Sequence, residues 1–188
     1  MTAPDTATSV PHPDPDAADI VRAAHGDQQA FARIVDRHLD RIHRLAWRSL
    51  DSRADAEEVA QETFLRAFGQ LPDWTPGKAR FSTWLYRVAL NLCQDRLRRR
   101  REQVPVEDLD LADPGAAPDR TLEQDQRRQR VEQALRALPQ RQREALLLCH
   151  FEGQSNAQAA QVLGVSVDAL ESLLARARRQ LRAELAHD

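Results

Sequence analysis

The segment Glu102 to Arg120 constrains the fold of this chain more than any other stretch. Its prolines and glycine interrupt helices, and its many carboxylates repel one another, so the segment has little to bury. The breakers are Pro105, Pro114, Gly115 and Pro118, and the acids are Glu102, Glu107, Asp108, Asp110, Asp113 and Asp119. We therefore expect two small domains, residues 17–101 and 121–188, joined by a flexible acidic linker over residues 102–120.

The stretches on both sides of this linker carry apolar residues spaced by three and four, the pattern of a helix with one buried face. We expect an all-α fold. Asp27 is placed to cap a helix that ends near Ser49, and Ser82 a helix that ends near Arg101. Between them, a helix capped by Ser52 or Asp55 is expected to bury Val59, Phe64, Leu65 and Phe68. Residues 1–16 hold four prolines and are expected to form a disordered tail.

Charge and cysteine content exclude several classes of protein. The formal net charge is only −2, but arginines cluster over residues 96–101 and 176–182, where they can meet phosphates. No segment is apolar enough to span a bilayer and no signal peptide opens the chain, so we expect a cytoplasmic protein. Cys93 and Cys149 form no CxxC pair and are interpreted as reduced core thiols. Neither a cofactor nor a metal site is expected, although a redox or zinc sensor built on these thiols stays open.

A helix-turn-helix pattern occupies the last part of the chain. Ser155 and Gln158 have the spacing of a capping box, Gly164 supplies a turn, and Ser166 can cap a second helix. Such a second helix fits the major groove of DNA. The alternative is an ordinary helical hairpin.

Aromatic and basic residues gather in the second half of the first domain. Aromatic rings stack on unpaired bases, Arg and Lys follow the phosphates, and Asn reads base edges. The residues are Trp74, Phe81, Trp84 and Tyr86, beside Lys78, Arg80, Arg87 and Asn91. The alternative is that most of these rings, Phe81 and Trp84 above all, belong to the core.

The order of these elements resembles the extracytoplasmic-function (ECF) sigma factors of bacterial RNA polymerase. DAEEVAQETFLRAF (Asp55 to Phe68) and FSTWLYRVALNLCQDRLRRRR (Phe81 to Arg101) are similar to the second conserved region of that family. LPQRQREALLLCHFEG (Leu138 to Gly153) and SNAQAAQVLGVSVDALESLLARARRQL (Ser155 to Leu181) resemble the fourth. The resemblance covers residues 27–185 apart from the linker. It implies a non-enzymatic subunit that directs transcription initiation.

The resemblance also implies a role for particular residues. Those that would face core RNA polymerase are Asp55, Glu58, Gln61 and Glu62. Those that would handle the opened −10 strand of promoter DNA are Trp74, Lys78, Arg80, Trp84, Asn91, Asp95 and Arg98. Those that would meet the −35 element are Asp168, Ala169, Glu171, Ser172, Arg176, Arg178 and Arg179. Glu171 and Leu173 depart from the family, where Lys and Arg are frequent. Glu171 would accept from a cytosine amine or repel phosphate, and Leu173 is expected to pack.

Further partners follow from the same resemblance. It implies control by an anti-sigma factor, which in this family is often membrane-embedded, and an acidic linker that threads the nucleic-acid channel of the polymerase. The alternative for the linker is a solvated tether. In the free protein, the two domains are expected to mask their DNA surfaces by packing on each other or on an inhibitor. Two rival interpretations remain: an autonomous repressor or activator that uses only the second domain, and an enzyme or metal sensor built on Cys149 and His150.

Overall fold

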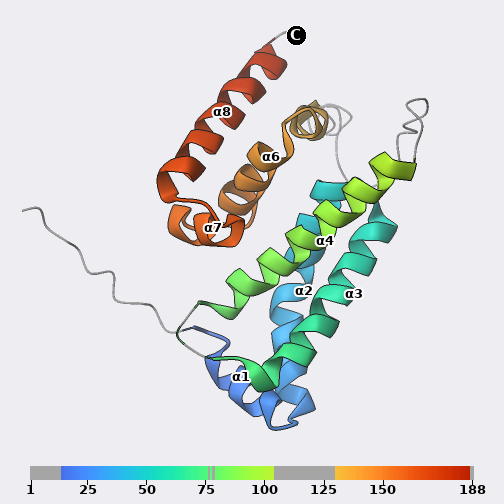
Figure 1. The fold of residues 1–188 in the computed structure, drawn as a ribbon, viewed down its shortest axis with the longest axis vertical. Helices are drawn as coiled ribbons and strands as arrows, with labels where there is room; N and C mark the ends of the chain where they lie inside the picture. Colours follow the sequence, from blue (N-terminus) through green and yellow to red (C-terminus); the bar gives the residue numbers. More distant parts are fainter. Residues whose placement is uncertain (1–13, 76, 78, 104–129, 187–188) are drawn as a thin grey trace, which may run out of the picture.

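The computed structural model describes residues 14–75, 77, 79–103 and 130–186, and these form helices without any strand (Figure 1). The first domain contains α1 (Ala17–Ala24), α2 (Gln28–Leu50), α3 (Arg53–Gln70), the short 3-10 helix η1 (Leu71–Asp73) and α4 (Phe81–Gln103). The second contains a helix over residues 130–136, α6 (Gln140–Leu146), the π-helical turn η2 (Leu147–Phe151), α7 (Asn156–Leu163) and α8 (Val167–Ala186). The all-α fold is confirmed. The linker lies mostly outside the described residues.

Local capping sets the helix boundaries in the first domain. The Asp27 carboxylate accepts from the Ala30 N–H at 3.0 Å, and the Ser52 hydroxyl accepts from the Asp55 N–H at 3.3 Å. Each bond satisfies a backbone donor that a helix leaves unpaired in its first turn. Asp51 ends α2 in the left-handed conformation, with φ of 53°.

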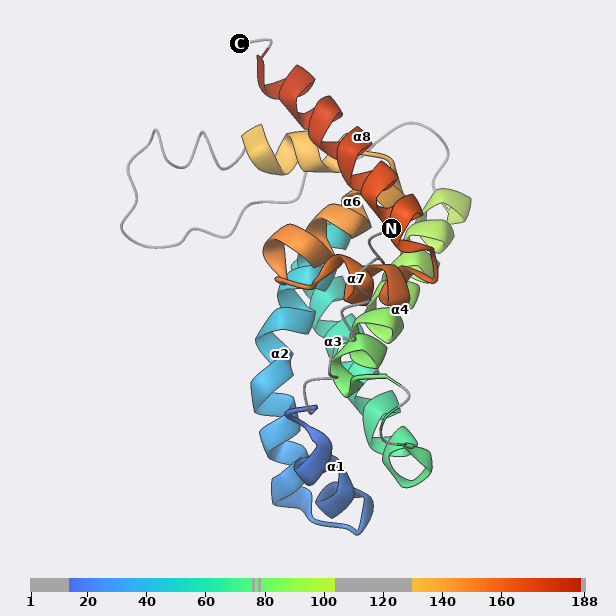
Figure 2. The same ribbon diagram turned by 90° about the vertical axis from the view of Figure 1, so that its left-hand side faces the viewer.

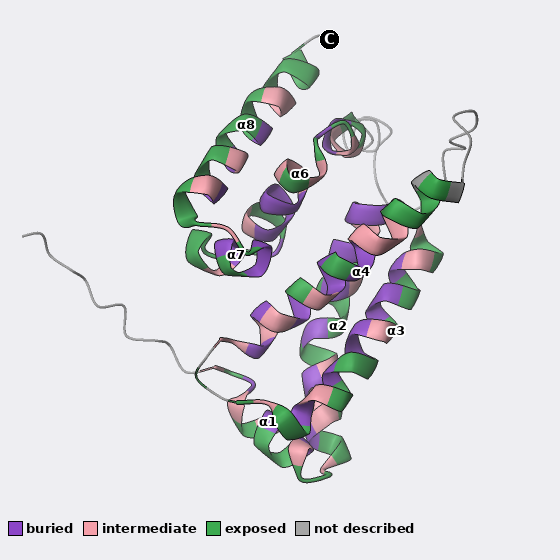
Figure 3. Ribbon diagram, viewed as in Figure 1, coloured by how far each residue is buried: buried purple, intermediate pink, exposed green. Residues whose placement is uncertain are grey.

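Three helices, α2, α3 and α4, enclose the core of the first domain (Figure 3). Ile34 and Leu45 of α2, Val59 of α3 and Leu85 of α4 are fully buried there. Removing one such side chain from water contributes about 1.5–3 kcal/mol. α1 packs on α2 and on η1 at one end of this bundle.

Residues 14–16, which the sequence assigned to the tail, take part in the first domain. Asp16 is fully buried, and its carboxylate accepts from the ring of His38 at 2.8 Å and from the guanidinium of Arg37. α4 also begins one residue before its predicted cap, Ser82, and its Phe81 N–H donates to the carboxylate of Asp14 at 2.7 Å. The rest of the predicted tail lies outside the described residues.

The second domain contains the expected helix-turn-helix. Ser155 and Gln158 form a reciprocal capping box at the start of α7, and Gly164 makes the turn with φ of +66°. The stretch before the helix-turn-helix forms α6 followed by η2, and the spacing of its apolar residues does not indicate the wider π-helical turn.

The two domains lie against each other, an arrangement that we call the closed form. Figure 2 shows α7 beside α4, and η2 packs on α2. Apolar side chains from both domains belong to one continuous buried cluster. The Arg136 guanidinium pairs with Asp51 at 2.9 Å, and the Arg48 guanidinium lies 4.5 Å from the ring centre of Phe151.

Candidate nucleic-acid interface

The recognition helix predicted from sequence is α8. The Ser166 hydroxyl accepts from the Ala169 N–H at 3.1 Å, and Leu170, Leu174 and Ala177 form the buried side of the helix. The predicted −35 residues lie on its other faces. Ala169 is half-buried, and the exposed members are Asp168, Glu171, Ser172, Arg176, Arg178 and Arg179. One face of α8 is thus exposed and free to enter the major groove of DNA, which admits a single α-helix.

The two residues of α8 that depart from the family have different surroundings. Glu171 accepts from the side-chain amide of Asn156 at 3.2 Å, so α7 holds this carboxylate on the exposed face of α8. Leu173 is half-buried and packs against the apolar cluster, as predicted. Of these two residues, only Glu171 faces outward with a side chain that can form a hydrogen bond to a base.

An aromatic cleft lies where α4 begins. Its volume is 450 Å³, and it is lined by Gln70, Asp73, Trp74, Thr75, Ala79, Thr83, Trp84, Arg87 and Gln161. The half-buried rings of Trp74 and Trp84 have their centroids 6.2 Å apart. Phe81 is fully buried beneath them, with its centroid 4.9 Å from that of Trp74 and 5.7 Å from that of Trp84. The cleft offers aromatic surface to a flat ring.

Two of the four aromatic residues considered for base stacking belong to the core instead. Phe81 and Tyr86 are buried, whereas Trp74 and Trp84 reach the cleft. Arg80 is half-buried beside the cleft. Lys78 lies outside the described residues.

A polar stripe continues from the cleft along α4. Asn91 and Arg98 are exposed and Asp95 is half-buried, one and two turns from one another on the same face. The Arg98 guanidinium pairs with Asp95 at 3.0 Å. The sequence did not single out Thr83, whose buried hydroxyl lines the cleft without a hydrogen-bond partner in the described residues.

In the closed form, the second domain contacts α4 at Arg87, one turn before Asn91, although Arg87, Asn91 and Arg98 stay exposed. The Arg87 guanidinium donates to the Gln161 carbonyl and, at 3.4 Å, to the Val162 carbonyl. These carbonyls lie at the C-terminal end of α7, where a cation is favoured by the helix dipole. Gln161 also lines the aromatic cleft, so α7 stands at its edge.

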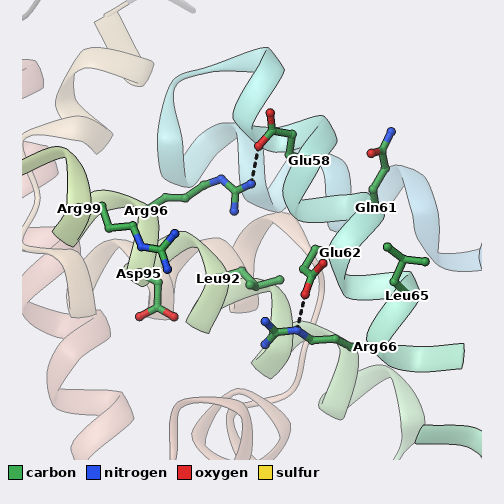
Figure 4. Close-up of a pocket in the computed structure, with 9 residues that line it drawn as sticks. All are labelled: Glu58, Gln61, Glu62, Leu65, Arg66, Leu92, Asp95, Arg96 and Arg99. Atoms are coloured by element: carbon green, nitrogen blue, oxygen red, sulfur yellow. Dashed lines mark hydrogen bonds and ion pairs between the residues drawn. The ribbon is translucent and has the colours of Figure 1, made fainter. Parts of the chain in front are cut away.

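The predicted polymerase face lies on α3, beside a groove of 360 Å³ between α3 and α4 (Figure 4). The three acidic residues of this face form ion pairs with arginines of the chain itself. Arg96 pairs with Glu58 at 2.7 Å and lies 3.6 Å from Asp55, and Arg100 also pairs with Asp55. Glu62 pairs with Arg66 at 2.8 Å, whereas Gln61 is exposed. The arginines at the end of α4 therefore neutralise part of the acidic face.

Two residues predicted to be buried on α3 are exposed instead. Leu65 and Phe68 have 69% and 57% of their surface accessible. They follow Gln61 by one and two turns and share its outward face, while Val59 and Phe64 face the core. The periodicity of a helix with apolar residues on two flanks does not say which flank is covered.

Two carboxylates of the second domain are buried against the first. Glu144 accepts from the Gln94 amide at 3.0 Å, and Glu152 accepts from the Tyr86 hydroxyl at 3.3 Å. In each, the second oxygen is buried without a hydrogen-bond donor among the described residues. Burial raises the pKa of both carboxyls above the ordinary value for Glu, and the surrounding amides, hydroxyl and arginines offset only part of that rise.

The two thiols are free in the structure. Burial raises the pKa of Cys93 to about 12, and it also raises the pKa of the half-buried Cys149. The described residues contain no cluster of His, Cys, Asp and Glu that could hold a metal ion. No described helix is long and apolar enough to cross a membrane.

Comparison with known proteins identifies both domains. Models of sigma-70 region 2 and of sigma-70 region 4 match residues 34–103 and 128–181. The fold and these matches define a sigma factor of the sigma-70 class.

Named relatives narrow this class. The chain is 37% identical to the ECF RNA polymerase sigma factor SigE of Mycolicibacterium smegmatis, over 87% of this chain and 65% of SigE. It is 35% identical to the RNA polymerase sigma factor NccH of Alcaligenes xylosoxydans xylosoxydans, over 92% of this chain and 96% of NccH. In a solved structure, CnrH in complex with the cytosolic domain of CnrY superposes with a TM-score of 0.72 at 31% identity, over 92% of this chain and 98% of CnrH. The chain belongs to the ECF sigma factors.

Proposed function

We propose that this chain binds core RNA polymerase through the outward face of α3 and directs it to promoters. The exposed face of α8 reads the −35 element, and the cleft at the start of α4 holds a base extruded from the −10 strand. Flipping a base out costs a few kcal/mol, which stacking between aromatic rings offsets. The observation that carries this proposal is the pairing of a tryptophan-lined cleft on one domain with an exposed helix-turn-helix on the other.

The polymerase performs all the chemistry, and the chain works in the cytoplasm. The raised pKa of Cys149 argues against an enzyme or sensor built on this thiol. A raised pKa keeps the thiol protonated, whereas the thiolate is the form that attacks a substrate or binds a metal. A Cys149→Ala variant should therefore support normal transcription. Loss of transcription in a variant that is still folded would favour the rival.

The closed form must open before the promoter is read. Arg87 is bonded to α7 carbonyls, and Gln161 stands at the edge of the cleft, so the second domain occupies the approach of the −10 strand. The proposed polymerase face on α3 lies outside this contact, so the polymerase can bind the closed form. The domains would then separate on the polymerase.

An anti-sigma factor, soluble or membrane-embedded, keeps the chain inactive. Two similar solved proteins have bound partners: CnrH is in complex with the cytosolic domain of CnrY, and the sigma factor RpoE, at 26% identity and a TM-score of 0.68, is in complex with the anti-sigma factor NepR from Bartonella quintana. Cross-links between the chain and its inhibitor should fall on both domains. Cross-links confined to one domain would contradict an inhibitor that holds the closed form.

Run-off transcription with core polymerase tests the proposal. Genomic fragments selected with the reconstituted holoenzyme serve as templates. Added chain should start transcripts from discrete sites, and Asn91→Ala should keep polymerase affinity while reducing opening. Tight duplex binding by the chain alone, with no gain in transcription, would support the autonomous repressor or activator.

A further inference from the structure

Asp14 joins the start of the described chain to the start of α4. Its carboxylate accepts from the Phe81 N–H at 2.7 Å with one oxygen and from the Asp16 N–H at 3.0 Å with the other. Its backbone carbonyl accepts from the Ala17 N–H at 3.0 Å. The side chain therefore bridges two segments that lie 67 residues apart in sequence.

The segment that carries Asp14 is itself held firmly on α2. Asp16, two residues on, is fully buried, and its carboxylate bonds to Arg37 and His38. Ala17 begins α1, which packs along α2. Asp14 is thus a fixed point of the first domain, and a helix end bonded to it is fixed as well.

The bonded helix end does not line the aromatic cleft itself but packs behind the two tryptophans that do. Phe81 is fully buried, its ring contacts Trp74 edge-on and stacks on Trp84 with an interplanar angle of 19°. A shift of the first turn of α4 would move Trp84, which belongs to that turn, relative to Trp74, which follows η1. A negative charge at this end is also favoured by the helix dipole.

We propose that Asp14 is a positioning residue for −10 recognition: it caps α4 from a distance and so fixes the spacing of Trp74 and Trp84. This inference rests on the proposed function of the cleft. Asp14 itself contacts no DNA. Loss of the Asp14 carboxylate should therefore reduce the discrimination between bases at the extruded position more than it weakens the binding of polymerase.

The test compares Asp14→Ala with Asp27→Ala, a matched control. Asp27 also accepts a backbone N–H at a helix start, that of Ala30, but it lies at the start of α2 and does not line the cleft. Full-length variants are combined with core polymerase. Opening is followed by 2-aminopurine fluorescence on promoters that differ only at the extruded base.

We expect Asp14→Ala to reduce the discrimination between the two promoters by about fivefold, the value of one lost cap. Asp14→Asn keeps one acceptor and should lie between Ala and wild type. Asp27→Ala should lower the melting temperature to a similar extent and leave discrimination unchanged. Equal loss in both alanine variants, or none in Asp14→Ala, would overturn the inference. Failure of the wild-type holoenzyme to open any promoter would instead refute the proposed function.

Discussion

Asp16 combines complete burial with a net negative charge. Burial alone raises the pKa of a carboxyl, but hydrogen bonds from His38 and Arg37 and the charges of both outweigh it, so the pKa of Asp16 is lowered. A carboxyl with a lowered pKa contributes stability above the pKa of the unfolded chain. That contribution is lost as the pH falls through the lower, folded value.

Replacing Asp16 by Asn should therefore lower the free energy of unfolding by about 2 kcal/mol at neutral pH, because Arg37 and the buried His38 lose the negative charge and one of the two acceptor oxygens. Urea denaturation of both proteins measures the difference. Asp36→Asn, at an exposed position of the same region, serves as the control. The difference should shrink in strongly acidic buffer, and a constant gap at every pH would contradict this account.

Among the elements, α3 shows how far a sequence predicts a helix. The cap at Ser52 and the core positions Val59 and Phe64 follow from residue type and spacing. The exposure of Leu65 and Phe68 does not, because an unassembled subunit leaves apolar surface for a partner that its own sequence does not contain.

We expect Leu65→Ala with Phe68→Ala to weaken the complex with core polymerase about tenfold, since exposed apolar anchors carry much of the affinity of an interface. Biolayer interferometry measures the dissociation constant. Leu39→Ala, which removes another exposed leucine on α2, should leave it unchanged. Equal affinity of the double variant and the wild type would remove these residues from the docking face.

A second prediction at this scale concerns α8. If Arg176 meets a phosphate, Arg176→Ala should weaken binding of the holoenzyme to all promoters alike and reduce the salt dependence of the affinity by about one ion. Titration of a −35 duplex at several salt concentrations measures this slope. A loss confined to one promoter sequence would assign Arg176 to base reading instead.

At the scale of the whole molecule, the sequence predicted two helical domains but not the contacts between them. The acidic and proline-rich segment indicates the division, whereas Glu144 and Glu152 look like ordinary surface residues of a helix and its end. Their burial depends on Gln94 and Tyr86, more than 45 residues away. The bond from Phe81 to Asp14 is hidden for the same reason: no local pattern links residues so distant.

The closed form should be sensitive to pH. The pKa values of Glu144 and Glu152 are raised while both are buried and return to the ordinary value of 4.5 on opening. Arg41, Arg44 and Arg48 of α2 and Tyr86 of α4 face Glu152, and Gln94 of α4 and Arg141 and Arg143 of the second domain face Glu144. Opening therefore releases protons. The closed form is favoured below the raised pKa values and loses its advantage as the pH rises through them.

The radius of gyration, from small-angle X-ray scattering, should accordingly increase as the pH rises above 4.5. Glu144→Gln with Glu152→Gln should stay compact over the same range. Glu184→Gln, with the same change of charge at an exposed site on α8, should behave as the wild type. A double variant that opens more readily than the wild type would show that both carboxylates are ionised in the closed form.

Promoter opening on the intact DNA tests the central claim most directly. Permanganate modification of thymines reports the melted −10 strand, and nuclease protection reports contact at the −35 element in the same sample. Core polymerase with this chain should give both signals on a selected promoter, and either component alone should give neither. Melting without −35 protection, or protection by the chain alone, would contradict a pair of domains that reads one promoter from the polymerase.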